Sequence, residues 1–94
     1  MKVENKWGVP NQFVITEEGH GSNGNFIKKE VFQSYESAIV EMITWNDRVD
    51  IKLDKTYWDY SKTTGIYRNK FLNEDKKTTE KKIKSGEYVL TNLN

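Results

Sequence analysis

Apolar and charged residues alternate most regularly at residues 49–54, where three aliphatic side chains are each followed by a charged one. Alternation with a period of two is typical of a strand that is buried on one face. Two earlier segments also fit strands: the apolar run at residues 11–16 and the longer stretch at residues 26–35. The loop between them, residues 19–25, consists mostly of glycine, asparagine and serine, so the two strands are expected to form a long hairpin.

Residues 37–45 fit either a strand or a helix. A helix would place Ile39, Met42 and Ile43 on one face, whereas a strand would turn Ile39 and Ile43 away from Met42. An Asn-Asp turn pair follows at residues 46–47, directly before the alternating strand. A strand on each side of this turn makes a simple hairpin, so the sequence favours a strand.

The last third of the chain predicts two helices and a final strand. Asp59 or Ser61 can cap a helix near residues 61–73, because a side-chain oxygen accepts hydrogen bonds from the free amides of a first helical turn. Residues spaced as one helical face follow: Tyr60, Thr64, Tyr67 and Phe71. A shorter helix is expected near residues 79–85, ending at Ser85-Gly86, and residues 87–92 fit a closing strand.

These elements predict a single α+β domain over residues 1–94. Its sheet should contain four or five antiparallel strands, with one main helix and one short C-terminal helix. The segment 1–10 is open to being a flexible N-terminal extension. Trp58 lies between the alternating strand and the capped helix, so it is expected to be buried at the hinge of the core.

Composition argues against several kinds of function. The chain has no cysteine and one histidine, which excludes a zinc site of nitrogen and sulfur ligands. Residues 19–24 spell G-x-G-x-x-G, but a dinucleotide site also needs a helix opening at the third glycine. His20 lies in that loop without a defined partner and is expected to be dispensable. We therefore expect no catalytic residues, cofactor or metal, and a protein that is not an enzyme.

No apolar run approaches the length of about 20 residues that a membrane helix requires, so we expect no membrane association and a cytoplasmic protein. The net charge of +1 is unevenly distributed. Residues 1–61 carry 7 basic and 10 acidic side chains, and residues 62–94 carry 8 and 4. The excess gathers in a lysine group that could contact nucleic acid or form a solvated helix face: Lys76, Lys77, Lys81, Lys82 and Lys84.

Several motifs together resemble a group of small uncharacterised proteins of phages and mobile elements. The motif segments are Phe32-Gln33-Ser34-Tyr35, Trp58-Asp59-Tyr60-Ser61 with Thr63-Thr64, and Tyr67-Arg68-Asn69-Lys70-Phe71-Leu72. The resemblance runs from Asn11 onward, and the loop at residues 19–25 is longer than in typical members. The resemblance implies no known activity for this chain. It does imply a bacterial host and a small protein that binds host or defence machinery, such as a CRISPR-type component.

Two function classes follow, with protein binding favoured over nucleic-acid binding. Trp, Tyr and Arg dominate the energetic centres of protein interfaces, which makes Trp7, Trp45 and Arg68 the candidate contacts. Both tryptophans could instead close the ends of a small core. The lysine group above is the candidate contact for nucleic acid. The oligomeric state is open.

Overall fold

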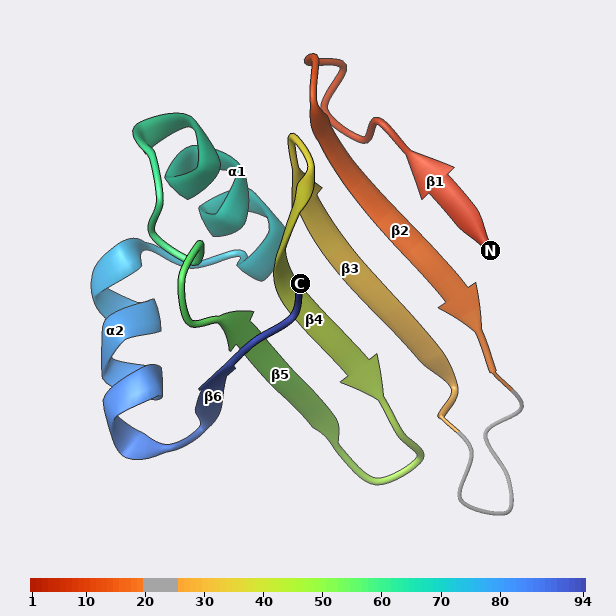
Figure 1. Ribbon diagram of the computed structural model, residues 1–94. Helices are drawn as coiled ribbons and strands as arrows, with labels where there is room; N and C mark the ends of the chain where they lie inside the picture. Colours follow the sequence, from red (N-terminus) through yellow and green to blue (C-terminus); the bar gives the residue numbers. More distant parts are fainter. Residues whose placement is uncertain (20–25) are drawn as a thin grey trace.

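The computed structural model describes residues 1–19 and 26–94 (Figure 1). Within these residues, six strands and two helices follow one another. They are β1 (Lys2–Glu4), β2 (Gln12–Glu18), β3 (Lys28–Ser34), β4 (Ser37–Thr44), β5 (Val49–Asp54), α1 (Lys62–Leu72), α2 (Lys76–Ser85) and β6 (Tyr88–Thr91). The predicted α+β class is confirmed.

The strands form one sheet in the order β1-β2-β3-β4-β5-β6. All neighbours are antiparallel except β5 and β6, which pair in parallel because both helices lie between them and return the chain to the same end of the sheet. The predicted strand count was therefore one too low, and the sheet is mixed. The missed strand, β1, has three residues, too few to show alternation, and it pairs with Val14–Thr16 of β2 rather than forming a flexible extension.

The strand prediction for residues 37–45 is confirmed by β4, and a β-bulge explains why the pattern was ambiguous. Phe32 pairs with Val40 while Gln33 pairs with Ala38, so Ile39 is an extra residue in the ladder. A bulge breaks strict alternation. Ile39 and Val40 are consequently both buried although they are consecutive. Two consecutive buried residues are typical of a helix, and for this reason the sequence pattern of β4 also fitted a helix.

The predicted cap of α1 and the predicted end of α2 are confirmed, but α2 begins earlier than predicted. The Ser61 side chain accepts a hydrogen bond from the backbone N–H of Thr64 at the start of α1. Helix α2 begins at Lys76, three residues before the predicted start, because Asp75 caps it by accepting from the N–H of Thr78. Gly86 ends α2 with φ +86°, a conformation that glycine adopts without a steric penalty.

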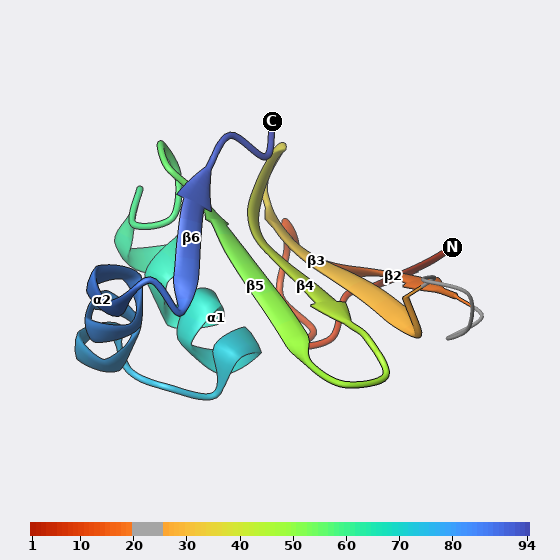
Figure 2. The same cartoon turned by 90° about the horizontal axis from the view of Figure 1, so that it is seen from below.

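The helices lie against one face of the twisted sheet (Figure 2). The core on that face consists of Phe32, Ile39, Val40, Leu53 and Tyr88. Side chains from both helices pack on it, including Phe71 from α1 and Ile83 from α2. Among the described residues, no helix combines the length and apolar character needed to span a membrane.

Candidate functional site

The end of β5 is fixed by one buried carboxylate. Asp54 is 1% exposed, and its Oδ2 accepts hydrogen bonds from the backbone N–H groups of Thr56 (3.0 Å) and Tyr57 (2.9 Å). Its Oδ1 accepts from the N–H of Leu93 (2.8 Å). Burial by itself raises the pKa of Asp54, but these amide donors outweigh it and the pKa lies below its ordinary value. Asp54 therefore ties the chain after β5 to the C-terminal segment.

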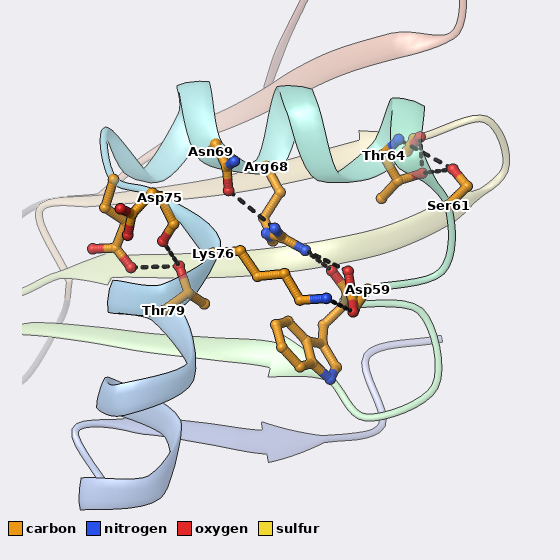
Figure 3. Close-up of polar contacts among 11 residues, drawn as sticks. Asp59, Ser61, Thr64, Arg68, Asn69, Asp75, Lys76 and Thr79 are labelled. Atoms are coloured by element: carbon orange, nitrogen blue, oxygen red, sulfur yellow. Dashed lines mark hydrogen bonds and ion pairs between the residues drawn. The ribbon is translucent and has the colours of Figure 1, made fainter.

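Arg68 fixes the following loop, residues 55–61, from α1. Its side chain is 1% exposed, and its Nη1 donates to the carbonyl oxygen of Trp58 (2.8 Å) and to Oδ1 of Asp59 (3.3 Å). Its Nη2 donates to Oδ1 of Asn69 (3.0 Å), as Figure 3 shows. The guanidinium also lies over the Trp58 ring, 5.3 Å from its centre. Trp58 is partly buried under this contact, rather than fully buried as predicted.

Asp59 joins the loop to the second helix. Its Oδ2 lies 2.7 Å from Nζ of Lys76, the first residue of α2. Partial burial raises the pKa of Asp59, but the contacts with Lys76 and Arg68 lower it by more, so its pKa lies below the ordinary value. Asp59 is thus bound by a side chain from each helix, Arg68 of α1 and Lys76 of α2, as Figure 3 shows.

The fixed loop presents two tyrosines. Tyr57 and Tyr60 form an edge-to-face pair with ring centres 5.4 Å apart and an interplanar angle of 71°. Tyr60 is 69% exposed. It was expected to lie on the buried stripe of the main helix, but α1 begins after its cap at Ser61, so Tyr60 precedes the first turn and faces outward.

Opposite these rings stands the two-residue turn between β3 and β4. Tyr35 occupies it with φ +57°, a left-handed conformation that is costly for a bulky side chain, and is 53% exposed. Its N–H donates to the carbonyl oxygen of Asn11 (2.7 Å). The hydroxyls of Ser34 and Thr64 lie 2.9 Å apart and connect the turn to α1.

Between the turn, the loop and the start of α1 lies a cleft of about 710 Å³. Three tyrosines line it: Tyr35, Tyr57 and Tyr60. We call it the tyrosine cleft. Its other polar lining consists mainly of Ser and Thr hydroxyls, and Glu36 is the one charged residue among the described residues that line it. Rings with hydroxyl groups at a concave surface suit recognition of a ligand that is partly apolar.

The three residues predicted as protein contacts lie elsewhere. Trp7 packs edge-on against Phe32 (5.8 Å between ring centres) and close to Tyr67 (5.4 Å), so it closes one end of the core. Trp45 contacts Phe26 and donates from Nε1 to Asp50 (2.8 Å). Trp7 therefore matches the alternative in which a tryptophan closes the core, whereas the contacts of Trp45 are with Phe26, Arg48 and Asp50, outside the core cluster. Arg68 is too buried to reach a partner, because its charge is used inside the fold.

The lysine group is divided by the fold. Lys76 pairs with Asp59, and Nζ of Lys82 lies 2.9 Å from Oε1 of Glu74. Lys77, Lys81 and Lys84 share one exposed stripe of α2, and in the described part of the chain none of them forms an ion pair. A phosphate contact would therefore have three free cations available rather than five.

A second buried polar cluster joins α2 to β6. Glu74 accepts from the hydroxyls of Thr79 (2.6 Å) and Tyr88 (2.8 Å) in addition to Lys82. Burial raises the pKa of Glu74, but these donors lower it overall. The hydrogen bond to Glu74 raises the pKa of Lys82 to about 12, and burial raises that of Tyr88 to about 12. Each member has a partner within the fold, so the cluster is structural.

Two predictions concern chemistry: those about the glycine-rich loop with His20, and the one about metal binding. His20 and residues 20–24 of the glycine-rich loop lie outside the described residues. Within residues 1–19 and 26–94, no group of three or more His, Asp or Glu side chains is arranged to hold a metal ion. The tyrosine cleft, at about 710 Å³, is larger than the hollow beside Gly65 and Arg68 (about 460 Å³) and the one beside Phe13 and Ile15 (about 250 Å³).

A family model described as a family of unknown function (DUF8033) matches residues 2–87. The chain belongs to DUF8033. No curated protein and no solved structure matches it significantly. The DUF8033 match covers every element except β6, so the loop, α1 and the β3–β4 turn that build the tyrosine cleft all lie within the family region.

The tyrosines of this DUF8033 chain are the functional candidates that the sequence pattern did not reveal. Tyr60 was assigned to the core, and Tyr35 was assigned to the face of a strand. One signal was available: a two-residue connection between strands is normally made by Gly, Asn or Asp. Tyr35 and Glu36 in that place break a local rule, and such breaks gather at functional sites.

Proposed function

We propose that this chain is a non-enzymatic accessory protein of a phage or mobile element that binds a host or defence-system protein through the tyrosine cleft. The mobile-element context rests on the resemblance of the Trp58–Ser61 region, and it implies action in the bacterial cytoplasm. The preference for a protein target rests on the cleft.

One observation carries the proposal: Tyr35 is exposed at a position whose backbone conformation disfavours it. Left-handed backbone at a non-glycine residue costs on the order of 1–3 kcal/mol and is retained where the surrounding structure imposes it, commonly at binding sites. The ring at this position contributes to the cleft wall and lies outside the core. Its presence is explained by a contact with a partner.

The scaffold supports this role. Interface anchors are effective when they are held rigidly before binding, because less side-chain and loop entropy is lost. Asp54, Arg68 and Lys76 hold the loop that carries Tyr57 and Tyr60 through five hydrogen bonds and ion pairs with distances of 2.7 to 3.3 Å. Tyrosine suits such a surface because it combines a large apolar ring with a hydroxyl.

The experiment is an affinity purification from a bacterial host, compared across three forms of the protein and with and without nuclease. Wild type should retain a specific protein that Tyr35→Asn loses, because asparagine tolerates the left-handed turn but removes the ring. The variant with Lys77, Lys81 and Lys84 changed to Gln should retain it, and nuclease should have no effect. Direct titration of the purified partner then measures the affinity.

Nucleic-acid binding is the second candidate, supported by the exposed stripe of Lys77, Lys81 and Lys84. This second proposal would replace the first under three conditions. Nuclease would abolish the capture, the triple Gln variant would lose it, and Tyr35→Asn would keep it.

A further inference from the structure

The lining of the tyrosine cleft also indicates what kind of protein segment fits it. We infer that the cleft binds an extended, proline-rich segment with a basic residue beside the prolines. This inference rests on the proposed function, because it names the chemical class of the partner segment at the same site.

The ring arrangement suits a polyproline II helix. Domains that bind proline-rich segments present grooves between aromatic side chains, into which the proline rings pack. Here Tyr57 and Tyr60 are in edge-to-face contact at 71°, so together they offer two ring surfaces at an angle to each other. Tyr35 lines the same cleft. A segment that is already extended also loses little conformational entropy on binding.

The hydroxyl groups suit the same ligand. A polyproline II segment has no internal hydrogen bonds, so its carbonyl oxygens need donors when they leave water. Serine, threonine and tyrosine hydroxyls are such donors, and Ser37 and Thr63 line the cleft together with the tyrosines. A ligand rich in prolines supplies acceptors and few N–H donors, which matches this lining.

The negative charge of Glu36 in the cleft favours a ligand with a basic residue beside its prolines. Glu36 follows Tyr35 in the turn and is exposed, and no lysine or arginine is among the residues that line the cleft. A carboxylate at the rim attracts a cation and repels phosphate or an acidic segment. An RNA or DNA strand is therefore a poor occupant, even though its bases could stack on the tyrosines.

Pairing of a partner strand with the start of β4 is disfavoured. Residues 37–39 of β4 lie beyond the residues that pair with β5, and there the Asn94 side chain binds Ala38: its Oδ1 accepts from the Ala38 N–H (2.8 Å) and its Nδ2 donates to the Ala38 carbonyl oxygen (3.0 Å). The backbone groups that an added strand would need at Ala38 are already paired.

Titrations followed by NMR amide shifts of the full chain test the inference. The probe is a synthetic oligoproline peptide flanked by arginine. Its controls are the same peptide with glutamate for arginine, the same peptide with alanine for proline, and oligothymidine. The arginine peptide should bind most tightly and should move amides of residues 34–37 and 57–64. Tyr60→Ala should weaken it about tenfold. Glu36→Gln should reduce the preference for the arginine over the glutamate peptide.

Tyr60 and Glu36 are exposed, so both variants are expected to fold, and the spectra report this directly. Equal binding of the alanine peptide, tighter binding of the glutamate peptide or of oligothymidine, or shifts confined to other surfaces would each overturn the inference. If no proline peptide binds while Tyr35→Asn still abolishes capture of the natural partner, the ligand class is wrong and the proposed function stands.

Discussion

The Arg68 guanidinium lies over the ring of Trp58 and donates to the carbonyl oxygen of the same residue, so one cation fixes both the side chain and the backbone of the loop. Arg68→Leu removes these contacts and leaves Asp59 with Lys76 alone. Hydrogen bonds to charged groups contribute about 1.5–3 kcal/mol, so we expect the free energy of unfolding to fall by about 2–3 kcal/mol. Urea denaturation measures it. Lys62→Met, an exposed change on the same helix, is the control; a loss no larger than that of the control would contradict the assignment.

Tyr35→Asn separates stability from binding. Releasing a bulky side chain from a left-handed position should raise the free energy of unfolding by about 1 kcal/mol. The variant should melt at an equal or higher temperature than wild type and yet fail to capture the partner. Thermal melting and binding are measured on the same preparation. A variant that is clearly less stable than wild type would show that the ring is structural.

Gly65→Ala should stabilise the protein. Gly65 lies within α1, where glycine is disfavoured relative to alanine by about 1 kcal/mol. A Cβ at this position would stand 3.6 Å from Nη2 of Arg68, an ordinary van der Waals contact. We expect an increase of up to about 1 kcal/mol in the free energy of unfolding. A decrease would mean that the Arg68 side chain cannot tolerate even this contact.

Acid should destabilise the fold through Asp54 and Glu74. Both have pKa values lowered from the ordinary 3.8 and 4.5, so their contribution is present in full only above these ordinary values and is lost as the pH falls through the lowered ones. Urea denaturation at neutral pH and at pH values below 4 measures this loss. Asp54→Asn should be less stable at neutral pH and should lose less on acidification than wild type. An identical pH slope in the variant would contradict the role of Asp54.

Salt dependence tests the exposed lysine stripe. If the protein acts through the tyrosine cleft, its binding to DNA or RNA should be weak and should vanish near ~150 mM salt, because surface charges are screened there. Changing Lys77, Lys81 and Lys84 to Gln should leave partner binding unchanged. Micromolar nucleic-acid binding at that salt, with a slope that flattens by roughly one unit per lost contact in the variant, would favour the alternative function.

Local pattern was sufficient to determine much of this fold. Period-two alternation and turn residues located β2, β3 and β5, and the capping groups at Ser61 and Gly86 located α1 and the end of α2. These patterns involve residues that are close together in the sequence, so they can be recognised without the tertiary structure. The short β1, the bulge at Ile39 and the parallel pairing of β6 were missed, because each depends on how a strand pairs with its neighbour in the sheet.

The candidate site was decided by tertiary structure alone. The sequence made Arg68 a candidate for surface contact and placed Tyr60 on a core-facing stripe, yet Arg68 is buried between Trp58 and Asp59 while Tyr60 is exposed. The difference arises because Ser61 starts the helix one residue after Tyr60, and because the loop folds back over α1 and offers Arg68 a carbonyl and a carboxylate. Burial of a charge depends on partners that meet only in the folded chain, so no local pattern contained that information.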